Sequence, residues 1–336
     1  MTEDFVWIDA GRTVILRRAG LAAADEVLAE HGIAEFDLLS TERALAGARR
    51  LAAAATAIHE VAPGQVPGLA AALLPYAAGE RPLVALGGGR VIDVAKAVAA
   101  VTGAAVAAIP TTMSGAEMSA SHRLPAGHEE RVAARVRPRL VIADPELMTS
   151  APEARLRASS LNALAHGADC LYTPLANPVS RMTALRGAEL IATALDQTPA
   201  ARARSDLALG SLLCGYAIDS AKAGLHHPVC QTLVRICGIP HAETNAAVLP
   251  RSAAFLAPRV PDLFDQLAAA LGADRAGLEA RLLELGGRPA GLGALGADRA
   301  RLGEVIETAL ARPELGAVPG APVGARDLEA LIESAW

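Results

Sequence analysis

The sequence predicts two domains: an α/β domain built on a parallel sheet, followed by an all-α domain. Apolar strand-like runs alternate with alanine-rich helical runs up to about residue 150, which is typical of a parallel sheet covered on both faces. From about Asp144 the apolar residues recur at helical spacing, and no long strand-like run follows. A chain of 336 residues with 52% hydrophobic content can bury two sizeable cores. We therefore expect domains at 1–149 and 150–336.

The elements of the first domain are predicted in order from composition. Apolar and β-branched runs predict strands at 13–18, 36–41, 83–88, 104–110 and 140–145. The alanine-rich segments predict helices at 19–32, 42–58, 68–79 and 91–103. The polar segment 121–139 predicts an exposed loop or hairpin in which His122 and His128 are solvated.

The second domain is predicted to be a succession of helices, with starts marked by Ser, Asp or Pro and ends marked by Gly or Pro. These helices are expected at 144–167, 172–195, 206–227, 229–237, 255–272, 275–287, 297–311 and 325–336. The Pro- and Gly-rich segment 311–326 predicts a surface loop.

Charge and composition exclude several classes of partner. The net charge is −5 with both signs interspersed, so we expect neither nucleic acid nor an anionic membrane as a partner. The first residues lack a signal-peptide pattern, and no apolar run is long enough to span a bilayer. The four cysteines lie in apolar helical segments without CxxC pairing, which suits buried thiols. We expect a soluble cytoplasmic protein that acts on a small molecule.

One loop of the first domain has the composition of a phosphate site. An apolar strand runs into Gly87, Gly88 and Gly89, and a helix that carries Asp93 follows. Glycines let a ligand approach the backbone at a helix N-terminus, where anions are favoured. This predicts a pyrophosphate site and a Rossmann-like nucleotide-binding domain, although a simple tight turn has the same composition.

The next predicted strand ends in a cluster of hydroxyls. Thr111, Thr112 and Ser114 follow it directly. Hydroxyls at the carboxyl end of a parallel strand suit hydrogen bonds to ribose and phosphate. An ordinary polar loop would look similar.

Histidines are concentrated in the second domain. His226, His227 and His241 fall within one otherwise apolar stretch, and upstream Asn162 and His166 are four residues apart on one helical face. Imidazole is a common ligand of zinc and ferrous iron, so three histidines and an oxygen ligand would make a divalent metal site. The alternative is buried structural histidines bonded to the backbone.

A set of motifs runs through nearly the whole chain. In order they are LGGGRVIDVAKA, AIPTTMSGAEM, DPEL, LNALAHGADCLY, ANPVSRMTALRGAELI, GLHHPVCQTL, IPHAETNAAVLP and ALARPE. In this combination the sequence resembles the iron-containing alcohol dehydrogenase superfamily, with its dehydroquinate synthase-like fold, and most of all the maleylacetate reductase branch. The resemblance implies a dinucleotide-binding domain, a helical domain, NADH or NADPH in the cleft between them, and a homodimer.

The resemblance also implies roles for individual residues. The pyrophosphate and nicotinamide side of the cofactor would lie against Gly87, Gly88, Gly89, Asp93, Thr111, Thr112 and Ser114. A divalent iron or zinc would be held by His166, His227 and His241, or these histidines would bind and protonate the substrate together with His226. Metal-dependent relatives have Asp at the position of Asn162, whereas maleylacetate reductases typically have Asn. An amide is a weaker metal ligand than a carboxylate.

Several positions depart from the family pattern. Arg90 replaces a serine, Gln231 replaces a histidine, Arg235 replaces a glycine, and Asn245 replaces a histidine. Gln cannot act as an acid or base, so a proton relay through Gln231 would be lost. Arg235 could anchor a carboxylate bidentately, or could block the cofactor cleft. We expect Asn162, Gln231, Arg235 and Asn245 to face the substrate.

Three functions follow as hypotheses. The first is an NAD(P)H-dependent reductase of a carboxylated, unsaturated keto compound such as maleylacetate, in which histidines stabilise the developing enolate or alkoxide. The second is a non-redox lyase, isomerase or cyclase whose nicotinamide site has been repurposed around Arg90, Gln231 and Arg235. The third is a catalytically silent partner subunit. Saturable nucleotide binding separates the first two, and any turnover argues against the third.

Overall fold

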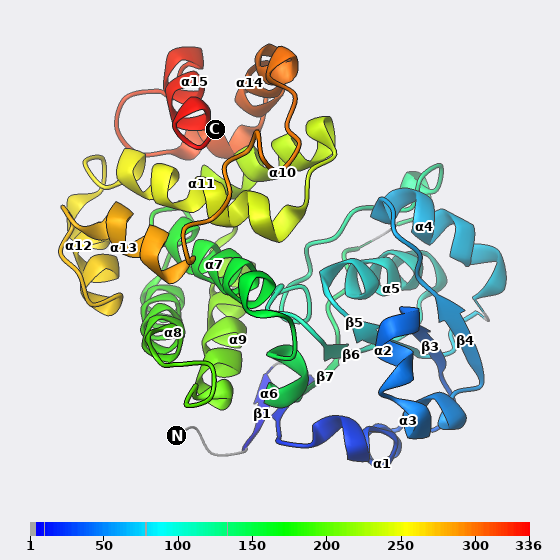
Figure 1. Ribbon diagram of the computed structural model, residues 1–336. Coiled ribbons are helices and arrows are strands. Elements are labelled where there is room, and N and C mark those ends of the chain that lie inside the picture. Colours follow the sequence, from blue (N-terminus) through cyan, green and yellow to red (C-terminus); the bar gives the residue numbers. More distant parts are fainter. Residues whose placement is uncertain (1–4, 10, 78, 133) are drawn as a thin grey trace. The chain divides into compact units, whose positions relative to one another are not determined.

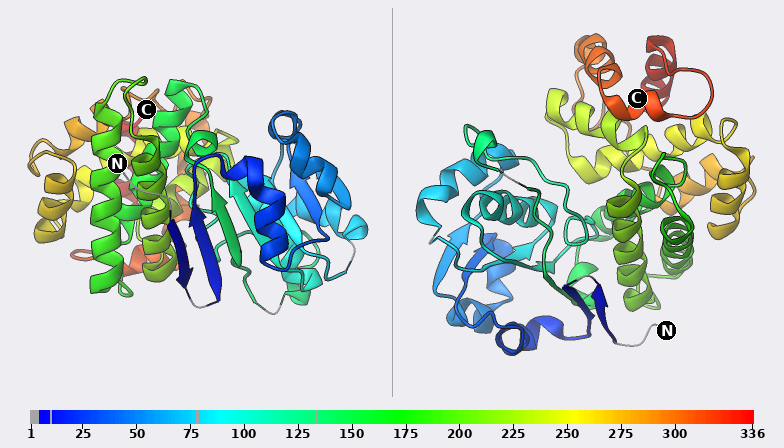
Figure 2. Two further views of the ribbon diagram at one scale, coloured as in Figure 1. Left: turned by 90° about the horizontal axis from the view of Figure 1, so that it is seen from below. Right: turned by 180° about the vertical axis from the view of Figure 1, so that it is seen from behind.

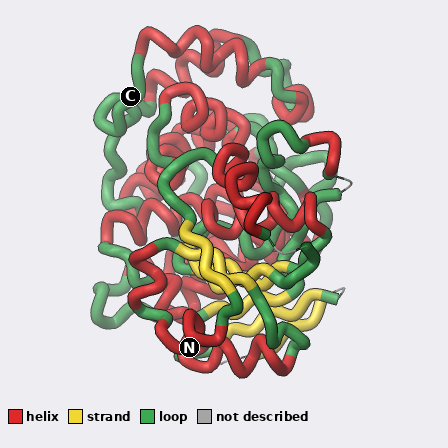
Figure 3. Tube along the Cα trace, turned by 90° about the vertical axis from the view of Figure 1, so that its right-hand side faces the viewer, coloured by secondary structure: helices red, strands yellow, loops and turns green. Residues whose placement is uncertain are grey.

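A computed structural model describes residues 5–9, 11–77, 79–132 and 134–336 (Figure 1). The chain divides into two compact units, Met1–Ser150 and Ala151–Trp336. The strands of the described residues lie in the first unit, and the second is built of helices (Figure 3). This confirms the predicted combination of an α/β part and a helical part.

The first unit is organised around one seven-stranded sheet in the order β1-β2-β7-β6-β5-β3-β4. All neighbouring strands from β2 to β4 in this order pair in parallel, and β1 pairs antiparallel with β2 (Figure 2). The strands are β1 Phe5–Asp9, β2 Arg12–Leu16, β3 Asp37–Ser40, β4 Ala57–Glu60, β5 Leu83–Gly87, β6 Val106–Pro110 and β7 Leu140–Ala143.

Helices cover both faces of this sheet because its buried strands are apolar on both sides. Val84 and Leu86 of β5 pack with α1 and α3 on one face, whereas Leu83 and Ala85 pack with α4 and α5 on the other. The helices of this unit are α1 Ala24–Glu30, α2 Glu42–Ala46, α3 Arg49–Ala54, α4 Val66–Leu73, α5 Gly89–Thr102 and α6 Pro145–Met148. The doubly covered parallel sheet confirms the fold class.

The prediction for 42–58 was wrong in part. A single helix was expected, but α2 ends at Gly47, α3 ends before Ala55, and residues from Ala57 form β4. Alanine suits helices by propensity, yet pairing with β3 decides the structure of this edge segment. Strand β1 was also not predicted from composition. It forms by antiparallel pairing with β2, which is a contact that composition does not reveal.

His122 is buried rather than solvated, which corrects a second prediction. Its Nδ1 lies 2.9 Å from the carbonyl of Arg123, and its Nε2 accepts a hydrogen bond from the amide of Val136 at 3.1 Å. Burial lowers its pKa. A polar segment was read as exposed, but these backbone partners let the ring lie inside.

The second unit is a layered bundle in which α7 packs against α8, α9 and α11. Glycines bring α8 and α9 close together, since a Cβ at Gly187 would lie 2.8 Å from the carbonyl oxygen of Gly210. The helices are α7 Glu153–Asp169, α8 Pro178–Asp196, α9 Arg204–Ala221, α10 His226–Cys237, α11 His241–Leu256, α12 Pro261–Ala270, α13 Leu278–Leu285, α14 Leu302–Leu310 and α15 Ala325–Ser334. None of the helices in the described part of the chain combines the length and apolarity needed to cross a bilayer.

The break between α9 and α10 sets the position of the histidines. One helix was expected over 206–227, but Lys222 follows α9 with φ at 65°, a conformation that does not continue a right-handed helix. A new helix then starts at His226. His226 and His227 therefore lie in the first turn of α10, not the last turn of α9.

Candidate active site

The histidine site begins with a polar stripe along α7. Asn162, His166 and Asp169 are spaced by four and three residues, so they share one face of the helix. They are 3%, 8% and 1% exposed. Buried polar side chains are costly unless they are bonded or meet a ligand, so this stripe is a candidate site within the bundle.

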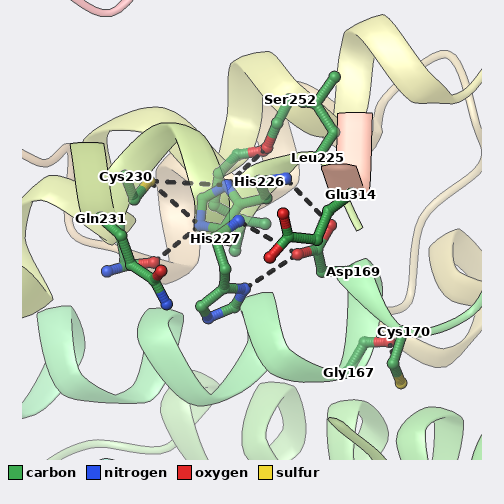
Figure 4. Close-up of polar contacts among 12 residues, drawn as sticks. Gly167, Asp169, Cys170, Leu225, His226, His227, Cys230, Gln231, Ser252 and Glu314 are labelled. Atoms are coloured by element: carbon green, nitrogen blue, oxygen red, sulfur yellow. Dashed lines mark hydrogen bonds and ion pairs between the residues drawn. The ribbon is translucent and has the colours of Figure 1, made fainter. Parts of the chain in front are cut away.

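Asp169 fixes the start of α10. Its Oδ1 accepts hydrogen bonds from the amide of His226 at 3.0 Å and from the hydroxyl of Tyr172 at 2.6 Å. Its Oδ2 accepts from the amide of His227 at 3.1 Å and lies 3.1 Å from Nδ1 of that ring (Figure 4). The first amides of a helix have no partner inside the helix. One carboxylate therefore caps α10 and orients the ring of His227.

The charge of Asp169 is held by its partners. Burial favours the neutral acid, but the hydrogen bonds and charges of His227, His226 and Tyr172 outweigh it, and the pKa of Asp169 lies well below its usual range. Burial and the same carboxylate raise the pKa of Tyr172 well above its ordinary value. An ionised acid next to a neutral phenol therefore persists throughout the physiological range.

His166 and His227 form a stacked pair. Their ring centroids lie 4.6 Å apart with the planes 15° from parallel. An ionised Asp169 can only accept, so Nδ1 of His227 carries the proton and Nε2 carries a lone pair. This Nε2 and the Nδ1 of His166 are buried and lack a hydrogen-bond partner among the described residues. Burial and the neighbouring histidines hold the pKa of His166 well below its usual value, so that ring stays neutral.

His226 uses both ring nitrogens within the protein. Its Nδ1 lies 2.8 Å from the hydroxyl of Ser252 (Figure 4). Its Nε2 lies 2.9 Å from Oδ1 of Asn245. Asn245 donates its amide to the carbonyl of His241 at 2.8 Å, which leaves Oδ1 turned toward His226. Burial lowers the pKa of His226 to about 3. The ring is therefore a neutral link between α10 and α11.

His241 stands at the margin of this group. It is the first residue of α11 and is exposed. In addition to burial, its charge contributes to lowering the pKa of both His166 and His226, which places it near them. The structure therefore brings His166, His226 and His227 together, with His226 and His227 at 5.1 Å between ring centroids.

This donor set fits a divalent metal poorly. Among the residues that the structure describes, no group of three or more His, Cys, Asp or Glu side chains is arranged to hold a metal ion. The rings of His166 and His227 are stacked, with their planes 15° from parallel. The position of a carboxylate ligand is Asn162, whose amide is a weak ligand. No step of the reaction is assigned to a metal.

A guanidinium meets the same face of α10. Gln231 follows His227 by one helical turn, and its Oε1 accepts a hydrogen bond from Nη1 of Arg312 at 3.4 Å. Arg312 is paired with Glu314. Arg235, for which sequence predicted a carboxylate-binding role, lies in the last turn of α10 and is exposed.

In the first unit the glycine triplet joins β5 to α5. Gly88 is the N-cap of α5, and Gly89 is its first residue. A Cβ at Gly88 would lie 3.0 Å from Oγ1 of Thr112, and one at Gly89 would lie 3.0 Å from Cβ of Ser114. A Cβ at Gly87 would lie 2.5 Å from Cγ2 of Val91, in the first turn of α5. Packing against Val91 thus requires glycine at position 87. At Gly88 and Gly89, the absence of a side chain leaves the backbone close to the loop that carries the hydroxyls of Thr112 and Ser114.

That hydroxyl loop lies directly beside the glycine turn. The amide of Thr111 donates to the carbonyl of Gly87 at 3.0 Å. The hydroxyls of Thr112 and Ser114 therefore gather at the first turn of α5, whose amides have no acceptor within the helix. Bare backbone, helix amides and hydroxyls together fit the phosphates of a dinucleotide.

Asp93 and Lys96 fasten this loop to α5. Asp93 pairs with the fully buried Lys96 at 2.8 Å. The ammonium of Lys96 also donates to the carbonyls of Ala116, Ser119 and Ser121 at 2.9, 3.1 and 2.7 Å. Asp93, predicted near the pyrophosphate, thus supports the loop through its lysine partner. Arg90, the other charge at this helix start, is exposed.

Glu117 is a buried carboxyl in the same loop. The hydroxyl of Ser114 donates to its Oε2 at 3.2 Å. Burial raises the pKa of Glu117 to about 7, although these hydrogen bonds and the charge of Lys96 oppose the shift. Its state is therefore coupled to the loop that carries Ser114.

Sequence reasoning did not single out Asp169, Glu117 or Arg312. Asp169 had a signal: it follows His166 by three residues inside an apolar helix, so a buried carboxylate on the same face could have been expected. Arg312 had none, because it meets Gln231 across 81 residues of sequence.

Comparison with known proteins shows the family. Residues 21–152 match the model of the iron-containing alcohol dehydrogenases, and residues 157–311 match the model of the C-terminal part of the Fe-containing alcohol dehydrogenase family. Maleylacetate reductase 1 of Rhodococcus opacus is 36% identical over 262 residues, covering 76% of this chain and 72% of that protein. Maleylacetate reductase of Burkholderia cepacia is 37% identical over 238 residues, covering 68% and 67%.

Solved structures agree with this assignment. An iron-containing alcohol dehydrogenase from Corynebacterium glutamicum has a TM-score of 0.84 and 29% identity, covering 96% of this chain and 94% of that one. Maleylacetate reductase from Rhizobium sp. strain MTP-10005 has a TM-score of 0.82 and 28% identity, covering 100% and 99%. The chain therefore belongs to the iron-containing alcohol dehydrogenase family, on its maleylacetate reductase branch, and is an NAD(P)H-dependent oxidoreductase.

Proposed function

We propose that this enzyme reduces a carboxylated, unsaturated keto compound of the maleylacetate type with NADH or NADPH. The relatives named maleylacetate reductases support this substrate class. The observation that carries the chemistry is the pairing of Asp169 with His227, because it leaves a buried, lone-pair nitrogen beside a neutral second imidazole.

When bound, the nicotinamide supplies a hydride to the conjugated carbon, and the electron pair of the double bond moves to the ketone oxygen as an enolate. His227, once protonated on Nε2, passes that proton to the enolate carbon, which completes the reduction. Asp169 stabilises the imidazolium formed in between, as a carboxylate behind a catalytic histidine does. His166 stays neutral, so the stacked ring does not repel that charge.

The other predicted residues have distinct roles in this proposal. Asn162 and Gln231 face the substrate, with Arg235 and His241 at the exposed margin. His226 and Asn245 act as positioning residues, because their bonds tie α10 to α11 behind the reacting group.

The first unit, 1–149 in the predicted division, is proposed to carry the dinucleotide, and the second to carry the substrate. Gly87, Gly88 and Gly89 with the hydroxyls of Thr111, Thr112 and Ser114 support the first role. We also propose a homodimer, which light scattering on the purified protein would test, and the cytoplasm as the compartment, because reduced nicotinamide is consumed there.

The test measures nucleotide binding and turnover in one series. We expect saturable, micromolar binding of NADH or NADPH by nicotinamide fluorescence, and one reduced nicotinamide consumed per maleylacetate, with 3-oxoadipate identified by mass. Absence of binding for either nucleotide at millimolar concentration would contradict the proposal. Turnover of maleylacetate without nucleotide consumption would instead support the non-redox alternative, which no contact of the described residues favours.

A further inference from the structure

Arg312 lies in the segment after α14, directly before a short 3-10 helix, Pro313–Ala317. Its Nε and Nη2 donate to the two carboxylate oxygens of Glu314 at 3.2 and 2.7 Å. Its Nη1 donates to Oε1 of Gln231 at 3.4 Å. Partners on two sides therefore hold the guanidinium plane in a fixed orientation, which reduces the entropy cost of binding a further group.

This guanidinium lies at the histidine site. Gln231 and His227 are four residues apart on α10, so their side chains share one face. Burial raises the pKa of Glu314, but the hydrogen bonds and the charge of Arg312 outweigh burial, so that the pKa is lowered. The charge of Asp169 opposes this lowering. Figure 4 draws Gln231, His227, Asp169 and Glu314 around the same place. Arg312 thus contacts α10 one helical turn from the predicted reacting group, His227.

We propose that Arg312 is the residue that binds a carboxylate of the substrate and so gives the enzyme its preference for carboxylated keto compounds. This inference rests on the proposed function. A guanidinium has five N–H groups, and the contacts with Glu314 and Gln231 use three of them. The contact to Gln231 is near the limit of hydrogen-bond distance, so an incoming carboxylate displaces it readily and forms a charge-assisted pair.

Exposure explains why Arg312 serves better than Arg235. The side chain of Arg312 is 30% exposed, so water screens its charge only in part. Arg235 is exposed at the end of α10, where an ion pair contributes little. The carboxylate of Glu314 orients Arg312, and in the absence of substrate Oε1 of Gln231 accepts the hydrogen bond of Nη1.

A site of this kind selects against neutral analogues. A binding position built to accept a charged group loses affinity when that group is missing, since the guanidinium must then give up water without a partner. The preference for maleylacetate over its dimethyl ester is therefore the direct measure of Arg312, and a general loss of structure would not change that ratio.

The experiment compares Arg312→Gln, Arg312→Lys and the wild type on maleylacetate and on its dimethyl ester. We expect Arg312→Gln to raise KM for maleylacetate roughly ten- to a hundredfold, from the loss of charge-assisted bonds. The kinetics on the ester and the KM for the nucleotide should stay unchanged. Arg312→Lys keeps the charge but not the fork, so its KM should lie between the two. The matched control is Arg186→Gln, which breaks an exposed pair with Glu189 on α8 and should match the wild type.

A second variant, Gln231→Glu, tests the proposal if Arg312→Gln folds poorly. Gln231→Glu places a carboxylate against Nη1 of Arg312 and should raise KM for maleylacetate several-fold more than KM for the ester. Equal losses on both substrates, or a ratio changed by Arg235→Gln and not by Arg312→Gln, would overturn the assignment. If the wild type binds nucleotide but does not reduce maleylacetate, the proposed function fails. Calorimetry with adipate on wild type and Arg312→Gln then tests the carboxylate site alone, and equal affinities reject it.

Discussion

At the scale of single residues, Asp169 combines two tasks that proteins often divide. It closes the start of α10 through the amides of His226 and His227, and it sets which nitrogen of the His227 ring carries the proton. The nitrogen that we propose to react is therefore aligned by the same group that holds its helix. Stability and activity should respond differently when parts of this arrangement are removed.

Asp169→Asn keeps the size of the side chain but removes its charge. We expect kcat to fall by about a hundredfold, because outer partners that fix a histidine have effects of this order. KM should change little. Steady-state kinetics with maleylacetate measures both values, and a kcat within twofold of the wild type would contradict the role of Asp169.

Tyr172→Phe is the matched control for this change. It removes a hydrogen bond to Asp169 and leaves the amide of Leu225 without its acceptor. A cost of about 1–3 kcal/mol in unfolding free energy is expected, with kcat nearly unchanged. Denaturant unfolding together with kinetics separates the two effects.

Asn162→Asp tests the treatment of the metal. A carboxylate in the buried stripe of α7, near His166, should raise the affinity for Zn²⁺ or Fe²⁺, since a charged oxygen is the stronger ligand. Elemental analysis after dialysis against each metal measures the content of variant and wild type. Equal, stoichiometric metal in both proteins would show that the amide already suffices as a ligand and would contradict the poor fit of this donor set to a metal.

At the scale of elements, the turn between β5 and α5 divides its glycines between packing and ligand approach. Gly87→Ala meets the helix and should destabilise the protein by roughly 1–3 kcal/mol. Gly89→Ala meets Ser114 and should weaken nucleotide binding roughly tenfold, as a lost charge-assisted contact does. Thermal unfolding and fluorescence titration distinguish the two outcomes.

Gly68→Ala gives the opposite sign and serves as the control. Gly68 lies exposed inside α4, and a Cβ there has no atom within 4 Å. The substitution should stabilise the protein by about 0.5–1 kcal/mol, through backbone entropy alone. Nucleotide affinity should equal that of the wild type; a loss would mean that the titration reports folding instead of binding.

The same turn shows which features of the fold could be predicted from the sequence. An apolar strand, three glycines and a helix were enough to predict the strand–turn–helix unit, because every signal there is local, whereas its role as a phosphate site stays a prediction. The break at Lys222 was missed, since nothing in the residue itself demands a positive φ. Strand β4 was missed because the alanine run directly before it favours a helix, whereas pairing with β3 makes residues from Ala57 a strand. Arg312 was missed because its contact is entirely tertiary.

At the scale of the whole molecule, two buried groups, one in each unit, couple stability to pH in opposite senses. In the second unit the folded-state pKa of His226 is depressed to about 3. The unfolded chain therefore binds more protons below about 6.5, and stability is lost as the pH falls through this window. In the first unit the raised pKa of Glu117, about 7, means that stability is lost as the pH rises toward that value from about 4.5.

Glu117→Gln should therefore raise the melting temperature more at pH 8 than at pH 5, because the variant no longer has to ionise a buried group. Differential scanning calorimetry at both values measures the difference. The exposed Glu30→Gln is the control and should shift neither value. A larger gain at pH 5 than at pH 8 would have the wrong sign and would exclude the burial of a titrating carboxyl.

Lys96 has a practical consequence. The sequence contains two lysines, Lys96 and Lys222. Lys96 is enclosed by loop carbonyls with no exposed surface, whereas the side chain of Lys222 is 54% exposed. Amine-reactive chemistry on the folded protein should therefore modify Lys222 and the α-amino group alone, so that one side chain offers a defined handle for surface immobilisation or a fluorescent dye. Labelling of Lys96 would then report that the loop whose carbonyls enclose it, at Ala116, Ser119 and Ser121, has opened.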